Sequence, residues 1–96
     1  MYGTVMIARL KNATAGEELR DSLNNWRQER PDRPGFVDTH LLLSEDGAQV
    51  VSAVRFESKE QYEAMADDPG QHEWYTTQLL PRLDGEPTWI DGNWFE

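Results

Sequence analysis

The 96-residue sequence predicts an α+β domain whose elements follow the order β-α-β-β-α-β. Three observations predict this order. Two runs of β-branched and apolar residues flank the pair Asp46-Gly47, which is typical of a β-hairpin. Two other stretches carry apolar residues at helical spacing behind a capping residue. Alternating segments near both ends of the chain complete a set of four strands.

The first strand is predicted from Tyr2 to Leu10, and both of its alternating faces are apolar, which favours cover on both sides. The first helix is predicted from Ala15 to Glu29. Its apolar residues recur at helical spacing and form one stripe, made of Leu19, Leu23 and Trp26. One face of this helix should therefore be buried.

Both ends of this helix carry recognisable signals. We expect Thr14 to cap its start, with Glu17 completing a capping box. Pro31 and Pro34 prevent the helix from continuing, and Gly35 leads into the hairpin.

The hairpin is predicted to join residues 37–43 and 49–56, because Asp46-Gly47 supplies the positive φ angles of a tight turn. One face is then almost wholly apolar, with the opposed pairs Leu43 with Val50, Leu41 with Ser52, Thr39 with Val54 and Val37 with Phe56. The other face is mixed, with Leu42 opposite Val51, His40 opposite Ala53 and Asp38 opposite Arg55. The charge match in the last pair favours this register. We expect helices over the apolar face, and His40 as an interface residue on the other.

The second helix is predicted to begin after Ser58, with Gln61 completing a capping box. Its inward stripe contains Tyr62, Met65 and Ala66. We expect a break near Pro69-Gly70, because Asp68 can cap a new helix and Pro69 favours the first helical position.

A separate helical piece should therefore run from Pro69 to about Leu80, where Pro81 stops it. Trp74 and either Gln78 or Leu79 should face inward along this piece.

The last strand is predicted from Thr88 to Phe95. With right-handed crossovers, this order of elements gives a ferredoxin-like fold, in which a four-stranded antiparallel sheet carries both helices on one face. Residues 1–96 are predicted to form this single domain. The other sheet face would be bare in a monomer, and the apolar pair Trp94-Phe95 lies near the end of the sequence. We therefore predict a two-fold homodimer with the bare sheet faces packed together.

The charge distribution argues against nucleic-acid binding. The formal net charge is −9, and it is uneven. Residues 1–34 contain six Lys/Arg against five Asp/Glu, whereas residues 35–96 contain three against thirteen. Phosphate backbones would be repelled by the larger part of the chain.

The composition also bears on metal binding and location. Without Cys the chain has no disulfide and no thiolate metal site. The two histidines, His40 and His72, lie far apart in the sequence, so we expect no metal site. No segment approaches the ~20 apolar residues of a membrane span, and residues 1–10 do not form a signal peptide. We expect a cytoplasmic protein with no membrane or nucleic-acid partner.

Two short motifs stand out. Pro34-Gly35-Phe36 leads into the second strand, and the stretch from Phe56 to Glu60 joins the third strand to the second helix. In these motifs and in its order of elements the chain resembles the dimeric α/β-barrel superfamily, and most of all its antibiotic-biosynthesis-monooxygenase-like members. The resemblance implies a homodimer with a central barrel and a pocket between helices and sheet in each subunit. Relatives include cofactor-independent oxygenases of polycyclic phenols, haem-degrading enzymes, lactone isomerases and members with no known activity.

This sequence lacks the residues that characterise the haem-degrading branch of the superfamily, so haem degradation is disfavoured. That branch places an Asn in strand 1, a Trp in helix 2 and a His ligand in the following helix, where this sequence has Val5, Met65 and Trp74. His72 is two residues away from the ligand position, which turns it by roughly 200° around a helix. We therefore expect no cofactor.

Five side chains are candidates for a functional site. His72, Trp74 and Tyr75 cluster early in the last predicted helix, and Trp26 and Tyr62 lie on the inward stripes of the other two. We expect His72 and Tyr62 to be catalytic proton carriers, since an imidazole titrates near neutral pH and a buried hydroxyl needs a partner. We expect Trp26, Trp74 and Tyr75 to bind a flat ligand. The alternative is core packing for Trp26, Tyr62 and Trp74, with His72 and Tyr75 partly exposed.

Three functions follow from these features. The first is cofactor-independent, monooxygenase-like oxidation, or isomerisation, of a small aromatic or quinone-type compound. The second is a non-catalytic ligand-binding or stress-related module of the same architecture. The third is a purely structural dimer with a filled core. A cavity of roughly a few hundred Å³ between helices and sheet would support the first two, whereas a solid core would leave only the third.

Overall fold

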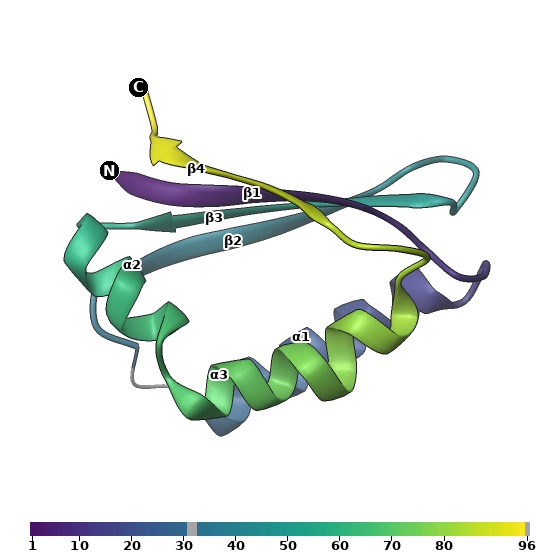
Figure 1. The fold of residues 1–96 in the computed structure, drawn as a ribbon, viewed down its shortest axis with the longest axis horizontal. Helices are drawn as coiled ribbons and strands as arrows, with labels where there is room; N and C mark the ends of the chain where they lie inside the picture. The colour runs from purple at the N-terminus through teal and green to yellow at the C-terminus, as the bar shows by residue number, and fades with distance from the viewer. Residues whose placement is uncertain (31–32, 96) are drawn as a thin grey trace.

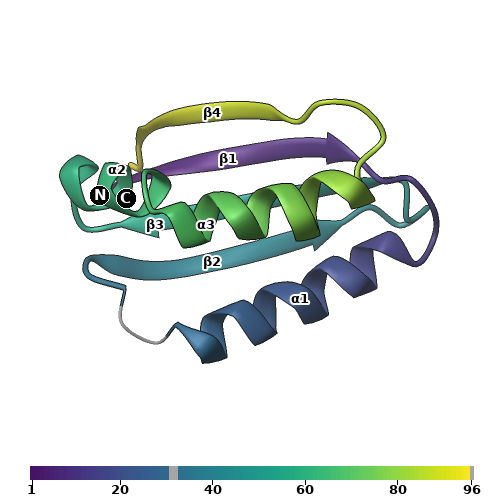
Figure 2. The same cartoon turned by 60° about the horizontal axis from the view of Figure 1, so that its bottom comes forward.

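The computed structural model describes residues 1–30 and 33–95 and confirms the predicted ferredoxin-like fold. The elements are β1 (Tyr2–Arg9), α1 (Ala15–Glu29), β2 (Phe36–Leu43), β3 (Gln49–Phe56), α2 (Lys59–Ala66), α3 (Pro69–Trp74), the π-helical turn η1 (Tyr75–Leu79), the 3-10 turn η2 (Leu80–Arg82) and β4 (Thr88–Asn93). The strands form one antiparallel sheet in the order β2-β3-β1-β4. All the helices lie on one side of this sheet, and its opposite side, the open face, carries none (Figure 1, Figure 2).

The hairpin has the predicted register over most of its length. Leu43 pairs with Val50 and Asp38 pairs with Arg55, so the two predicted faces are correct along this stretch. The predicted pairing of Val37 with Phe56 is wrong. A β-bulge between Phe36 and Asp38 places Phe36 opposite Phe56 instead, and the two rings meet edge to face at 5.7 Å and 82°. The bulge thus adds a second aromatic ring to the face that the helices cover.

The hairpin turn differs in one detail from the prediction. Only Gly47 has a positive φ, of 72°, and no non-Gly residue of the described chain does. Asp46 acts through its carboxylate, which accepts hydrogen bonds from the Ser44 hydroxyl at 2.6 Å and the Ala48 N–H at 2.9 Å. The turn is therefore held by these side-chain bonds together with a single left-handed glycine.

Two of the three predicted helix caps are confirmed. The Ser58 hydroxyl accepts from the Gln61 N–H, and the Asp68 carboxylate accepts from the Gln71 N–H, so the helix breaks before Pro69 as predicted. The capping role of Thr14, and with it the capping box, is wrong. Thr14 has helical backbone angles, and both its N–H and its hydroxyl donate to Asn12 Oδ1.

The C-terminal third departs from the predicted boundaries. The helical segment does not end before Pro81. Pro81 lies inside η2, at an early position of the turn where no N–H donor is needed. β4 ends at Asn93 rather than at Phe95. Trp94 lies beyond the end of the strand. Its indole crosses β1 at Gly3, and the indole N–H donates to Val54 O at 3.1 Å. Of the two proline signals for the end of α1, Pro31 lies outside the described residues.

Two groups of buried and half-buried side chains hold the layers together at opposite ends of the sheet. At one end is a core made of Met6, Ala8, Leu10, Ala15, Leu19, Val50, Leu79 and Leu83. At the other end is an aromatic cluster made of Tyr2, Phe36, Phe56 and Tyr62. Between these ends the helices and the sheet are less tightly filled. In the described parts of the chain, no helix has the length and apolar character needed to cross a bilayer.

Gly3 supplies the close approach that the crossing of Trp94 requires. A Cβ at this position would overlap Val54 O and Trp94 Nε1. We expect Gly3→Ala to lower the free energy of unfolding by about 2 kcal/mol or more, in the range of overpacking substitutions, measured by urea denaturation. Gly92 is a matched control, because it pairs with Gly3 across the sheet and has open space at its Cβ. An equal loss in Gly92→Ala would contradict the steric explanation.

The predicted charge pair on the open face is confirmed. Arg55 donates to both carboxylate oxygens of Asp38, at 2.8 and 2.6 Å, and these hydrogen bonds lower the pKa of Asp38 from its usual 3.8 to about 2. A lowered pKa stabilises the fold above the unfolded-state value, and this contribution is lost as the pH falls towards 2. We expect carboxylate NMR titration to place Asp38 about two units below Asp in the unfolded chain. Arg55→Gln should raise this pKa, and an unchanged titration in that variant would be evidence against the pairing.

Candidate functional site

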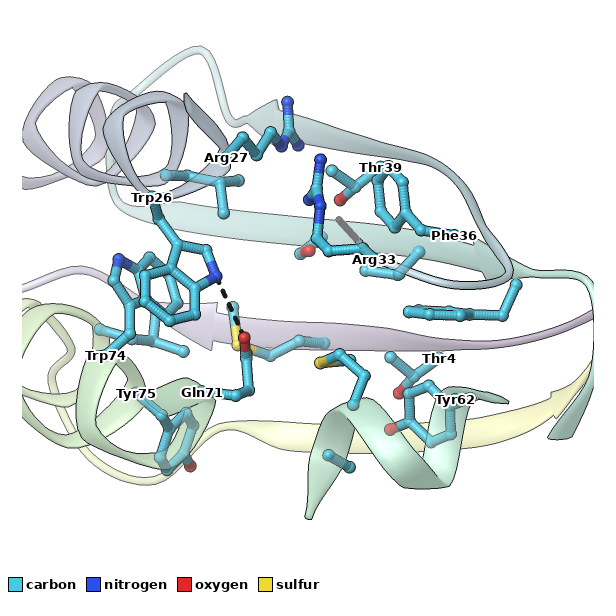
Figure 3. Close-up of a pocket in the computed structure, with 18 of the residues that line it drawn as sticks. Thr4, Trp26, Arg27, Arg33, Phe36, Thr39, Tyr62, Gln71, Trp74 and Tyr75 are labelled. Carbon is cyan, nitrogen blue, oxygen red and sulfur yellow. Dashed lines mark hydrogen bonds between the residues drawn. The ribbon is translucent and has the colours of Figure 1, made fainter. Parts of the chain in front are cut away.

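A cavity of about 280 Å³ lies between the helices and the covered face of the sheet. We call it the aromatic cavity. All five side chains predicted from the sequence to form a site lie on its wall: Trp26, Tyr62, His72, Trp74 and Tyr75. They come from α1, α2, α3 and η1, so the fold brings together residues that are up to 49 positions apart. Figure 3 shows four of them around a common space.

Two indoles form one wall of the aromatic cavity. Trp26 from α1 and Trp74 from α3 are stacked, with ring centroids 6.3 Å apart and planes 28° from parallel. The Trp26 N–H donates to Gln71 Oε1 at 3.2 Å, shown as the dashed line in Figure 3. Trp74 Nε1 is buried and has no hydrogen-bond partner among the described residues. This wall presents flat π surfaces and one unused donor, which suits a planar ligand with an acceptor atom.

A further aromatic side chain on the wall was not predicted. Trp89 of β4 lies opposite Met6 in the sheet register, which turns it towards the helices. Its ring packs against Tyr75 at 6.0 Å. The strict alternation of β4 could have identified it, because Trp89 and Asp91 fall on one face and Ile90 on the other.

Tyr62 is half-buried and forms a polar corner of the cavity. Its ring contacts Phe56 and Tyr2, and its hydroxyl donates to Asp91 Oδ1 at 3.3 Å. Burial raises the pKa of Tyr62 above its usual value, and the Asp91 carboxylate acts in the same direction. A phenol with a raised pKa stays protonated at neutral pH, so Tyr62 can donate a hydrogen bond or a proton but is a poor base.

His72 lies at the exposed edge of the aromatic cavity, in the last turn of α3. Within residues 1–30 and 33–95, no hydrogen bond or ion pair holds its ring in one orientation. Its position allows proton exchange between the cavity and water, while its catalytic role remains a prediction. His40 lies on the open face, 3.5 Å from Asp38, and is not part of this wall.

Two arginines that the sequence reasoning missed also line the aromatic cavity. Arg27 comes from α1 and Arg33 from the segment before β2. The Arg33 guanidinium lies over the Phe36 ring, 4.1 Å from its centroid. Arg27 lies four residues after Leu23 on the apolar stripe of α1, and this spacing was the available signal that it faces inward.

The described residues contain no group of three or more His, Asp or Glu side chains close enough to hold a metal ion. The polar groups around the aromatic cavity are instead single donors and acceptors, such as Tyr62, Gln71 and the two arginines. The arrangement can orient an organic ligand and exchange protons with it.

The fold and the site define a class: ferredoxin-like α+β proteins with an aromatic cavity between helices and sheet. No family model and no curated protein sequence matches this chain. Solved structures do match, and they confirm, at the level of the fold, the predicted resemblance to antibiotic-biosynthesis-monooxygenase-like proteins.

The chain is similar to the monooxygenase from ActVA-Orf6 of Streptomyces coelicolor, solved in complex with nanaomycin D. The TM-score is 0.85 and the identity 23%, over 99% of this chain and 88% of that chain. It is also similar to SnoaB, a cofactor-independent oxygenase from Streptomyces nogalater, with a TM-score of 0.73 and 17% identity over 98% and 94% of the two chains. A dimeric ferredoxin-like protein of unknown function from Jannaschia sp. has a TM-score of 0.71 and 13% identity, over 97% and 99%.

Proposed function

We propose that this protein is a cofactor-independent, monooxygenase-like enzyme that oxidises a small, flat aromatic compound of the phenol or quinone type. The observation that supports this proposal best is the aromatic cavity itself, whose volume of about 280 Å³ lies near the lower end of ligand sites. Its stacked indoles offer a planar surface, and Tyr62 and Gln71 add single polar groups to the wall. The likeness to a monooxygenase solved with nanaomycin D and to a cofactor-independent oxygenase supports the same reaction class.

The proposed roles follow from the positions of the side chains. Trp26, Trp74 and Tyr75 stack against the flat ligand and fix its plane. A phenolic substrate that loses a proton is electron-rich enough to reduce O₂ itself, with one oxygen atom entering the substrate and the other leaving as water. The protein then has to orient the substrate and handle protons. The Tyr62 hydroxyl, which is protonated at neutral pH, donates a hydrogen bond to a substrate oxygen. His72, at the exposed edge, carries the proton to water.

A non-catalytic ligand-binding module is the second candidate, and one observation favours it. The Tyr62 hydroxyl already donates to Asp91, and no described residue orients the His72 ring. In a site arranged in advance for proton transfer, hydrogen bonds usually orient the acid and the base towards the substrate, and neither side chain is oriented in this way here. A purely structural dimer with a filled core is disfavoured by the open space between the layers.

The test is a titration of the protein with planar probes, followed by turnover. Three of the four tryptophans line the cavity, so binding of an anthraquinone should quench intrinsic fluorescence saturably. We expect Trp74→Leu to weaken binding by about tenfold, as expected when one stacked ring is removed from a ligand site. Phe95→Leu is the control, because Phe95 is 97% exposed. O₂ uptake with anthrone-type substrates then separates the two candidates, since binding without turnover supports the module and no binding excludes both.

We further propose that the open face pairs with a second copy of the chain. Apolar side chains run across it from edge to edge, and Leu42, Ile7 and Ile90 are 66%, 40% and 58% exposed. Leu42 lies opposite Val51, which lies opposite Ile7, so the row is continuous through three strands. An exposed apolar row of this length is typical of an interface. The dimeric ferredoxin-like neighbour supports the same assembly.

Sedimentation at micromolar concentration is expected to show a dimer. Leu42→Glu should convert it to a monomer, because the substitution places a carboxylate in the apolar row. Gln28→Glu adds the same charge on α1, away from the open face, and should leave the dimer intact. A monomeric wild type would contradict the proposed dimer and would leave the proposal about the aromatic cavity unaffected.

A further inference from the structure

The two arginines of the aromatic cavity converge on one place. Arg27 reaches in from α1 and Arg33 from the start of the β2 segment, and Figure 3 shows their guanidinium groups turned towards one another beside Thr39. The Arg33 guanidinium is also stacked on Phe36. One end of this mainly apolar space therefore carries two positive charges.

Neither arginine has a carboxylate partner within residues 1–30 and 33–95. Four other arginines do pair with carboxylates: Arg20 with Asp21, Arg30 with Asp68, Arg55 with Asp38 and Arg82 with Glu18. The sequence contains 18 Asp and Glu against nine Lys and Arg, so carboxylates are abundant. The Nε atoms of Arg27 and Arg33 are buried and donate to no described residue.

This arrangement is unfavourable unless something else supplies negative charge. Burial lowers the pKa of both Arg27 and Arg33, and for Arg27 the nearby charge of Arg33 adds to the effect. Two like charges held close together and partly shielded from bulk water repel each other more strongly than they would when fully solvated. Several N–H donors of the pair also remain free to point at one ligand group.

We propose that Arg27 and Arg33 form the anion-binding end of the aromatic cavity, and that the ligand is a flat aromatic compound carrying a carboxylate. This inference rests on the proposed function and narrows its substrate class. A planar guanidinium matches a planar carboxylate with two parallel hydrogen bonds. The negative net charge of the chain disfavours a ligand with several negative charges. The rings of such a compound would lie against Trp26 and Trp74, which border the same space.

The test compares two probes of nearly the same shape, anthraquinone-2-carboxylate and neutral anthraquinone-2-carboxamide, by fluorescence titration. We expect the wild type to bind the carboxylate about tenfold or more tightly than the carboxamide, with a preference that shrinks as salt is added. Arg27→Gln and Arg33→Gln should each weaken carboxylate binding by about five- to tenfold. Both variants should bind the carboxamide as the wild type does.

Arg20→Gln is the matched control, because it removes the same charge from an exposed position of α1 and should keep the preference. Equal affinity of the wild type for both probes would overturn the anion site and leave the proposed function standing. Failure of both probes to bind would overturn the proposed function, and this inference with it. The comparison of probes and its salt dependence use the wild type alone, so they decide the question even if a variant does not fold.

Discussion

Phe56→Ala is expected to lower the free energy of unfolding by about 3–5 kcal/mol, as for other fully buried aromatic residues. Phe56 is 1% exposed and lies at the centre of the aromatic cluster. Its ring meets Phe36 edge to face at 5.7 Å and meets Tyr62 at 5.7 Å with planes 71° apart. A domain of this size has a total stability of about 5–15 kcal/mol, so the variant should be close to unfolding. Urea denaturation followed by circular dichroism measures the loss.

The control for this substitution is Phe95→Ala. Phe95 is 97% exposed, so removing its ring should change the free energy of unfolding by less than about 0.5 kcal/mol. Phe56→Leu should recover part of the loss, because leucine refills some of the volume. A cost below about 1 kcal/mol for Phe56→Ala would mean that the aromatic cluster does not hold this end of the fold.

The aromatic cluster has a second consequence, for the cavity. The core around Leu19 and Val50 closes the gap between helices and sheet at one end, and the cluster around Phe56 closes it at the other. The core thus supports α1 and η1 at one end of the sheet, and the cluster supports α2 at the other, which leaves space between the supports. The aromatic cavity is therefore a product of how the stabilising contacts are distributed.

The hairpin was the most predictable element, because several independent signals agreed on it. Alternation, the Asp46-Gly47 turn and the match of Asp38 with Arg55 all require one register. The bulge between Phe36 and Asp38 was not predictable, since an extra residue in one strand leaves the alternation around it intact. Its cause is tertiary: it brings the ring of Phe36 onto that of Phe56.

Helix caps illustrate the limit of reading local motifs. Ser58 and Asp68 have extended backbone angles and cap as predicted. Thr14 fits the same pattern, but Asn12 two residues earlier accepts from both its N–H and its hydroxyl. Whether a polar side chain caps a helix or bonds to a neighbouring residue depends on backbone angles that cannot be read from the sequence.

Most of the aromatic wall of the candidate site was predictable from helical spacing, whereas Trp89 and the two arginines were missed. Trp26 and Tyr62 lie on apolar stripes, so helical spacing alone turns them inward. Arg27 shares the stripe of Trp26, yet an arginine is usually exposed, and its type outweighed its position. Arg33 lies in a connecting segment without periodicity, so only the three-dimensional structure places it at the cavity.

Tyr62→Phe is expected to reduce kcat for an oxidisable anthrone-type substrate by about a hundredfold, the lower range for loss of a proton donor. The hydroxyl donates to Asp91 in the free protein, and the raised pKa of Tyr62 keeps it protonated through the neutral range. Phenylalanine keeps the ring contacts with Phe56 and Tyr2, so the fold and the cavity wall should persist. Ligand affinity should change by less than about threefold, because stacking supplies most of the binding. Oxygen consumption and fluorescence titration measure the two quantities separately.

Tyr2→Phe is the matched control, because it removes a hydroxyl from the ring next to Tyr62 that does not line the aromatic cavity. Its kcat should stay within about threefold of the wild type, since removing one hydroxyl oxygen from this ring changes the packing only slightly. Equal losses in both variants would assign the effect to packing of the aromatic cluster. Full activity in Tyr62→Phe would remove the phenol from the chemistry and leave His72 as the remaining proton carrier. A hundredfold loss confined to Tyr62→Phe, with unchanged affinity, is the pattern that only a hydroxyl acting on the reaction produces.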